Sequence, residues 1–130
     1  MGIRYRFVLR KHTEEREKSL VVAVDFDGTI TKDNDFPHNI GVLRDGCKEA
    51  IDYIRQQHKV IIWTCRNGEY LEEMEQFLRD NQIAYDGINT DIYPKTDRKI
   101  MADIYIDDKN IFCNGIDWVK IKEYFESLGR

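Results

Sequence analysis

Two carboxylates stand close together directly after an apolar run of the chain. Asp25 and Asp27 belong to the sequence Asp-Phe-Asp-Gly-Thr at residues 25–29, and the run Leu-Val-Val-Ala-Val occupies residues 20–24. Such a run is typical of a buried strand, and side chains two residues apart on an extended segment point the same way. We therefore expect Asp25 and Asp27 to face one point, where a hard cation and a phosphate would satisfy both acids. The simpler alternative is an acidic turn that only ends a strand.

Three further polar side chains follow later apolar runs. Thr64 comes directly after one run, and Asp107 and Asp108 come directly after another. A cationic stretch that contains Lys95 and Lys99 lies between these positions. Because the carboxyl ends of parallel strands share one edge of a sheet, these groups can meet in space. Together they would offer acids for a metal ion, a hydroxyl and an amine for phosphoryl oxygens, and a carboxylate that can attack phosphorus.

The pattern from residue 20 onward predicts an α/β domain. Short apolar runs alternate with amphipathic helical segments, which is typical of a mainly parallel sheet with helices on both faces. We expect five strands in a three-layer, Rossmann-like arrangement. The expected strands span residues 20–24, 60–63, 83–85, 102–106 and 111–113. The expected helices begin after a cap at Asp45, at Asn67 and Gly68, and after a cap at Asp117.

Length and charge limit the classes of protein that the chain can represent. A chain of 130 residues with 42% apolar side chains is expected to form one domain, here over residues 20–130. Residues 1–19 would form an N-terminal extension or edge strand followed by a charged linker. The net charge of −4 argues against general nucleic-acid binding and against binding to anionic membranes, because both depend on a basic face.

The cysteines indicate a reducing compartment. Cys47, Cys65 and Cys113 are odd in number and widely spaced, which suits free thiols better than a disulfide framework or a zinc site. The chain also contains no apolar run long enough to span a membrane or to act as a signal peptide. These features predict a cytoplasmic protein that does not bind membranes.

Over about residues 20–113, the chain resembles a phosphatase of the haloacid dehalogenase (HAD) superfamily. The resemblance rests on an Asp-x-Asp-Gly-Thr motif, an apolar strand ending in Thr, a downstream Lys and an acidic pair after a late strand, in that order. A response-regulator receiver uses similar residue types in a different order. The resemblance implies a HAD-like fold of the minimal, capless (C0-like) type, because residues 30–59 and 65–94 leave no room for a cap domain.

The resemblance also implies roles for the acidic residues. Asp25 would be the nucleophile and Asp27 the general acid and base. Mg²⁺ would be bound by a side-chain oxygen of Asp25, the main-chain carbonyl of Asp27 and the side chain of Asp107, with Asp108 nearby. Oxygen ligands of this kind are those that Mg²⁺ prefers.

Phosphate and substrate contacts are implied for residues that follow the later strands. Thr64 would bind a phosphoryl oxygen through its hydroxyl, and Lys99 would neutralise charge on the phosphoryl group, with Lys95 as the alternative. Arg66 and Asn67 follow Thr64 on the same rim, where they could contact the leaving group or the phosphate, or could have ordinary loop and helix-capping roles.

The function expected from these observations is Mg²⁺-dependent hydrolysis of a phosphomonoester through an aspartyl-phosphate on Asp25. Two alternatives are a non-catalytic phosphate-binding or interaction module on the same scaffold and a phosphotransferase. The expected substrate is a small phosphorylated molecule. Without a cap, the open site would be sheltered by a homo-oligomer or by the loop at residues 31–43, which is the local candidate for a lid.

Overall fold

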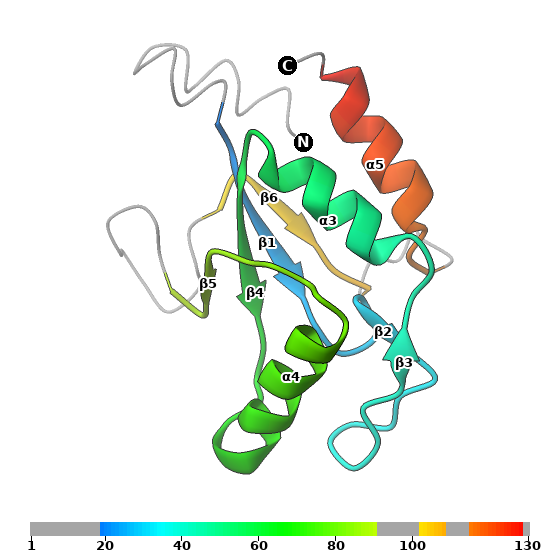
Figure 1. The fold of residues 1–130 in the computed structure, drawn as a ribbon, viewed down its shortest axis with the longest axis vertical. Coiled ribbons are helices and arrows are strands. Elements are labelled where there is room, and N and C mark those ends of the chain that lie inside the picture. Colours follow the sequence, from blue (N-terminus) through cyan, green and yellow to red (C-terminus); the bar gives the residue numbers. More distant parts are fainter. Residues whose placement is uncertain (1–18, 91–101, 109–114, 129–130) are drawn as a thin grey trace.

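The sheet of the domain is parallel and places the motif-bearing strand near its centre. The computed structural model describes residues 19–90, 102–108 and 115–128. In this part of the chain the main sheet has four strands in the order β5-β4-β1-β6 (Figure 1). The strands are β1 (Val21–Asp25), β4 (Lys59–Trp63), β5 (Gly87–Ile88) and β6 (Ile104–Ile106). The fold is thus α/β and Rossmann-like, as predicted. The strand predicted at residues 111–113, and residues 1–18 of the predicted N-terminal extension or edge strand and linker, lie outside the described residues.

The register of the sheet brings the carboxyl ends of its strands together. Asp25 pairs with Trp63 of β4, and Val24 pairs with Ile106 of β6. The arrowheads of β1, β4 and β6 accordingly point the same way in Figure 1. The residues that follow these strands therefore meet at one edge of the sheet.

The third predicted strand was wrong in its position. Instead of residues 83–85, the strand β5 consists of Gly87 and Ile88. The main-chain N–H of Ile83 donates to the carbonyl of Leu78 at 2.9 Å, which attaches this residue to the end of the preceding helix. Pairing with β4 begins only at Asp86, whose N–H donates to the carbonyl of Val60.

The described helices are α3 (Cys47–Arg55), α4 (Gly68–Asp80) and α5 (Trp118–Ser127). The predicted cap of α5 is confirmed, since the Asp117 side chain accepts hydrogen bonds from the first-turn N–H groups of Val119 and Lys120. The predicted cap of α3 is wrong. Gly46 holds that position with a φ of 81°, and Asp45 precedes it. A positive φ suits glycine and strains other residues, so backbone geometry decided this terminus.

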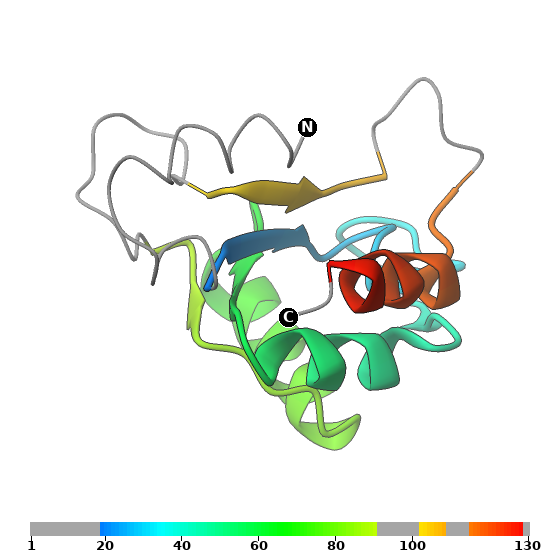
Figure 2. The same ribbon diagram turned by 90° about the horizontal axis from the view of Figure 1, so that it is seen from above.

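All three described helices pack on one face of the sheet (Figure 2). The larger core cluster joins Val22, Val24, Val60 and Ile62 to buried side chains of α3, α4 and α5. The other face carries a smaller cluster that includes Ile61. Helices were expected on both faces, and among the described residues a helical layer is confirmed for one of them.

A short hairpin follows the motif, in a segment for which the sequence predicted only a loop. Strands β2 (Thr31–Lys32) and β3 (Val42–Leu43) pair antiparallel, and Asp35 and Asn39 form an isolated bridge within their connection. Residues 26–58 are described throughout and contain this hairpin and α3, without an inserted cap domain. None of the helices in the described residues is long and apolar enough to cross a membrane.

Candidate active site

Three carboxylates converge where β1 and β6 end. Asp25, Asp107 and Asp108 each offer an oxygen, and these oxygens all lie within 4.8 Å of one another. We call these three residues the acid cluster. Asp25 lies about eighty positions before Asp107 and Asp108 in the sequence, and the three meet because β1 and β6 are parallel neighbours. The structure thus brings together three of the four acids that were predicted to share a site, namely Asp25, Asp107 and Asp108.

Burial and like charges strongly perturb Asp25. The pKa of this carboxyl is raised from its usual 3.8 to about 7, mainly by burial and in smaller part by the charges of Asp107, Asp108 and Asp27. A hydrogen bond from the Thr29 hydroxyl to Asp25 Oδ2, at 3.1 Å, acts in the opposite direction. A cation beside the cluster would offset the repulsion and favour the ionised form.

The turn after β1 lies close to Asp108. The N–H of Asp108 donates to Thr29 Oγ1 at 3.0 Å, so Thr29 links Asp108 to Asp25. Gly28 adopts a φ of 83°, and a Cβ at this position would overlap Asp108 Oδ2. Glycine is needed here for both the backbone conformation and the close approach. The indole N–H of Trp118 donates to the Thr29 carbonyl at 2.9 Å and fixes the turn from α5.

The acid cluster fits a small divalent cation. Its donors are hard carboxylate oxygens within one coordination sphere of each other, and this is the donor set that Mg²⁺ takes in proteins. Asp25, Asp107 and Asp108 would hold the ion, and the absence of a side chain at Gly28 leaves space for the Asp108 carboxylate.

Asp27 is held by an arginine. Arg66 donates from Nε to Asp27 Oδ2 at 2.8 Å and from Nη2 to Asp27 Oδ1 at 2.7 Å. The Arg66 side chain is fully buried, whereas 17% of the Asp27 side chain is exposed. Arg66, predicted on the rim as a possible substrate contact, therefore lies beneath the surface as the partner of Asp27.

Thr64 lies at the end of β4 and has a fixed backbone. The side-chain oxygen of Asn89 accepts from the Thr64 N–H at 2.9 Å, and the Asn89 amide nitrogen donates to the Thr64 carbonyl at 2.8 Å. Thr64 Oγ1 accepts from the N–H of Arg66 at 3.1 Å. Because the hydroxyl accepts this bond, its own hydrogen can be donated to an anion.

The other predicted contacts have different outcomes. Asn67 is exposed and occupies the N-cap position before α4, but its side chain makes no capping hydrogen bond. Lys99 and its alternative Lys95 lie outside the described residues, so the phosphate-binding lysine stays a prediction.

Comparison with known proteins supplies a relative of the same fold. Neither a protein-family model nor a curated protein matches the chain. A solved structure, that of a conserved protein coded by a locus of Bacteroides thetaiotaomicron, is 34% identical in sequence and superimposes with a TM-score of 0.72. The alignment covers 85% of this chain and 92% of the other.

The chain belongs to the family of this conserved protein. The likeness extends over nearly the full length of the Bacteroides thetaiotaomicron relative, so it includes the α/β fold described above. The acid cluster and the Arg66–Asp27 pair are thus set in a fold that this relative shares.

Two supporting residues were not predicted from the sequence. Thr29 was seen only as the end of the motif, although it links Asp25 to Asp108. Asn89 follows β5 with a φ of 50°, a conformation that Asn tolerates better than most residues. An Asn directly after Gly87 and Ile88 was the available signal, but its bonds to Thr64 depend on how β5 pairs with β4.

Proposed function

We propose that this protein is a Mg²⁺-dependent phosphomonoesterase of the HAD type that acts through an aspartyl-phosphate. The observation that carries the proposal is the convergence of Asp25 with Asp107 and Asp108, at the edge where Thr64 directly follows the neighbouring strand β4. A nucleophile, a cation-binding set and a hydroxyl donor for phosphate are then adjacent. The order of the sequence motifs, which differs from that of a receiver domain, supports the same conclusion.

In the first half-reaction, an Asp25 oxygen attacks phosphorus and the bond from phosphorus to the leaving oxygen breaks. Asp27 gives that oxygen a proton. In the second, water attacks phosphorus, gives a proton to Asp27, and releases Asp25 as a carboxylate. Bound Mg²⁺ would supply charge neutralisation between the anionic nucleophile and the anionic phosphate. The Thr64 hydroxyl and Lys99 would bind phosphoryl oxygens as negative charge spreads over them.

The proposal extends to substrate and setting. A small phosphorylated molecule is the expected substrate, with the hairpin between β2 and β3 or a second copy of the chain covering the site. The thiols of Cys47 and Cys65 are free, which suits the cytoplasm.

Phosphate release from an aryl phosphate tests the proposal. Wild-type protein should release phosphate with Mg²⁺ and lose activity in a chelator, and Asp25→Asn should lower the rate by at least about a thousandfold because the nucleophile is lost. Asp52→Asn is the matched control, since Asp52 lies on an exposed part of α3 in an ion pair with Lys48. Activity that survives both Asp25→Asn and chelation would refute the proposal.

The same experiment separates the two alternatives. Binding of Mg²⁺ and phosphate without turnover across a panel of phosphate esters would favour a non-catalytic module. A phosphorylated product formed from an added alcohol would favour a phosphotransferase.

A further inference from the structure

A buried guanidinium joins the acid Asp27 to two neighbouring segments. Besides its two bonds to Asp27, Arg66 donates from Nη1 to the carbonyl oxygen of Tyr70 in α4 at 3.3 Å. Two parallel N–H···O bonds from one planar group fix both the plane and the direction of a carboxylate. Asp27 is thus held in one orientation by a side chain that is itself attached to α4.

Two aromatic rings pack around the same guanidinium. Arg66 Cζ lies 5.5 Å from the centroid of Phe26 and 5.3 Å from that of Phe36. Phe26 is fully buried, whereas Phe36 is 49% exposed and lies in the connection between β2 and β3. Contacts between a cation and a ring face at this distance are attractive. The hairpin is therefore linked to Asp27 through Arg66.

We propose that Arg66 is a positioning residue that holds the Asp27 carboxylate ready to accept the proton of the hydrolytic water, and that Phe36 keeps Arg66 in place. This inference rests on the proposed function and deepens it. The two bonds from Arg66 hold the Asp27 carboxylate in one plane and one direction, and each oxygen keeps a further lone pair for water. In this step the water oxygen bonds to phosphorus and one of its protons goes to Asp27. The bond between phosphorus and Asp25 then breaks, and its electron pair returns to the Asp25 carboxylate.

Pre-steady-state kinetics with p-nitrophenyl phosphate isolates this step. Its leaving group departs without a proton, so formation of the aspartyl-phosphate should depend little on Asp27. In Arg66→Lys we expect a burst of nitrophenolate at close to the wild-type rate, followed by a steady-state rate about ten- to a hundredfold lower, because the base is misplaced. Acid quenching during the slow phase should trap phosphoenzyme.

Phe36→Ala provides a second, milder variant. The ring is half-exposed, so its removal leaves the core intact and keeps the test available even if Arg66→Lys does not fold. We expect a two- to fivefold lower steady-state rate, which is on the order of the effect expected for losing one cation–π contact at an exposed site. The burst should be unchanged. A steady-state rate equal to that of the wild type would contradict the role given to Phe36.

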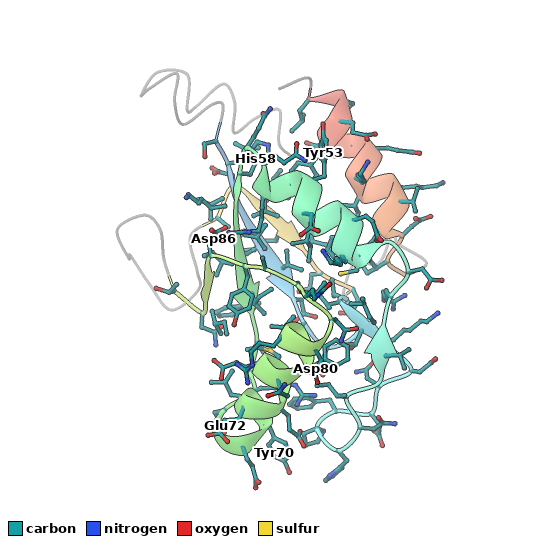
Figure 3. All side chains as sticks on the ribbon, viewed as in Figure 1. Tyr53, His58, Tyr70, Glu72, Asp80 and Asp86 are labelled. Atoms are coloured by element: carbon teal, nitrogen blue, oxygen red, sulfur yellow. The ribbon has the colours of Figure 1, made fainter. Side chains whose placement is uncertain are left out.

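A second arginine–aspartate pair offers a matched control. Arg55 donates to Asp86 from Nε at 3.2 Å and from Nη2 at 2.9 Å, while Asp86 also accepts the N–H of Val60 at the start of β4. In Figure 3 Asp86 lies well apart from Tyr70, the residue whose carbonyl oxygen accepts a bond from Arg66. Arg55→Lys should leave both the burst and the steady-state rate unchanged.

The double variant Asp27→Asn/Arg66→Lys completes the test. If Arg66 acts through Asp27, the second substitution should add less than about twofold to the effect of the first. The inference is overturned if Arg66→Lys slows burst and steady state equally, or if its effect persists in full on the Asp27→Asn background. Failure of the proposed function would look different, because the wild type itself would then release no phosphate, or would do so independently of Asp25.

Discussion

Replacing Asp25 with asparagine should stabilise the metal-free protein at alkaline pH while abolishing catalysis. Asparagine has nearly the same shape and can still accept the hydrogen bond of the Thr29 hydroxyl, but it removes one charge from the acid cluster. The substitution therefore tests whether the cluster is held together against its own repulsion.

The pKa of Asp25 sets the size of the effect. Because it is raised from 3.8 to about 7, ionising this group costs about 4 kcal/mol more in the folded protein than in the unfolded chain. Asp25 is partly open to solvent, and screening reduces this cost to about 2 kcal/mol. For a domain of this size, that corresponds to a rise in Tm of roughly 5–10 °C.

The direction of the pH dependence follows from proton binding. Between pH 3.8 and about 7 the folded protein binds more protons at Asp25 than the unfolded chain does, so this residue lowers stability as the pH rises through that interval. Above pH 7 the Asp25→Asn variant should therefore show its full gain in stability over the wild type, and near pH 4 it should show almost none.

Thermal unfolding followed by circular dichroism, in a chelating buffer at pH 4 and pH 8.5, measures this gain. Adding Mg²⁺ at pH 8.5 should raise the Tm of the wild type more than that of the variant, because a ligand that binds the folded state stabilises it. Asp52→Asn, outside the cluster, should behave like the wild type at both pH values. A gain of equal size at pH 4 and pH 8.5, or a loss at pH 8.5, would refute the electrostatic account of the cluster.

Three further predictions concern residues around the sheet. Gly28→Ala should lower stability by about 1–2 kcal/mol in chemical unfolding and weaken Mg²⁺ binding at least tenfold in calorimetry, because φ is positive and the new Cβ would displace Asp108. Asn89→Ala should raise the inhibition constant of inorganic phosphate about tenfold, since it removes both bonds to the Thr64 main chain, and an unchanged constant would contradict this. His58, whose neutral Nδ1 accepts a main-chain N–H and whose pKa is lowered by burial, should make stability fall as the pH drops below about 6.5. In His58→Gln this dependence should be weaker, as unfolding curves between pH 5 and 7.5 would reveal.

The main features of the fold could be predicted because they follow from local pattern. The apolar runs over residues 20–24 and 60–63 correspond to β1 and β4. Because the carboxyl ends of parallel strands share one edge of a sheet, Asp25 could be predicted to lie near the residues after β6. The Asp117 cap was predictable for the same reason, since a side chain and the N–H groups it bonds are neighbours in sequence.

Details that depend on packing were not predictable in this way. Gly46 rather than Asp45 holds the cap position of α3, and Ile83 bonds to the end of α4 instead of joining the sheet, because backbone geometry and the helix end competed with propensity there. The hairpin after β1 could not be predicted because strands of two residues carry almost no periodicity.

The sequence by itself determined which acids gather at the edge of the sheet, since alternation and strand order are properties of the chain. Only the tertiary structure decided which partners hold the neighbouring residues Asp27 and Thr64. Arg66 lies 39 positions from Asp27, and Asn89 lies 25 positions from Thr64. No periodicity relates such pairs. Their contacts arise when α4 and β5 pack beside β1 and β4, and burial then makes each polar group take the partner that the fold brings within reach.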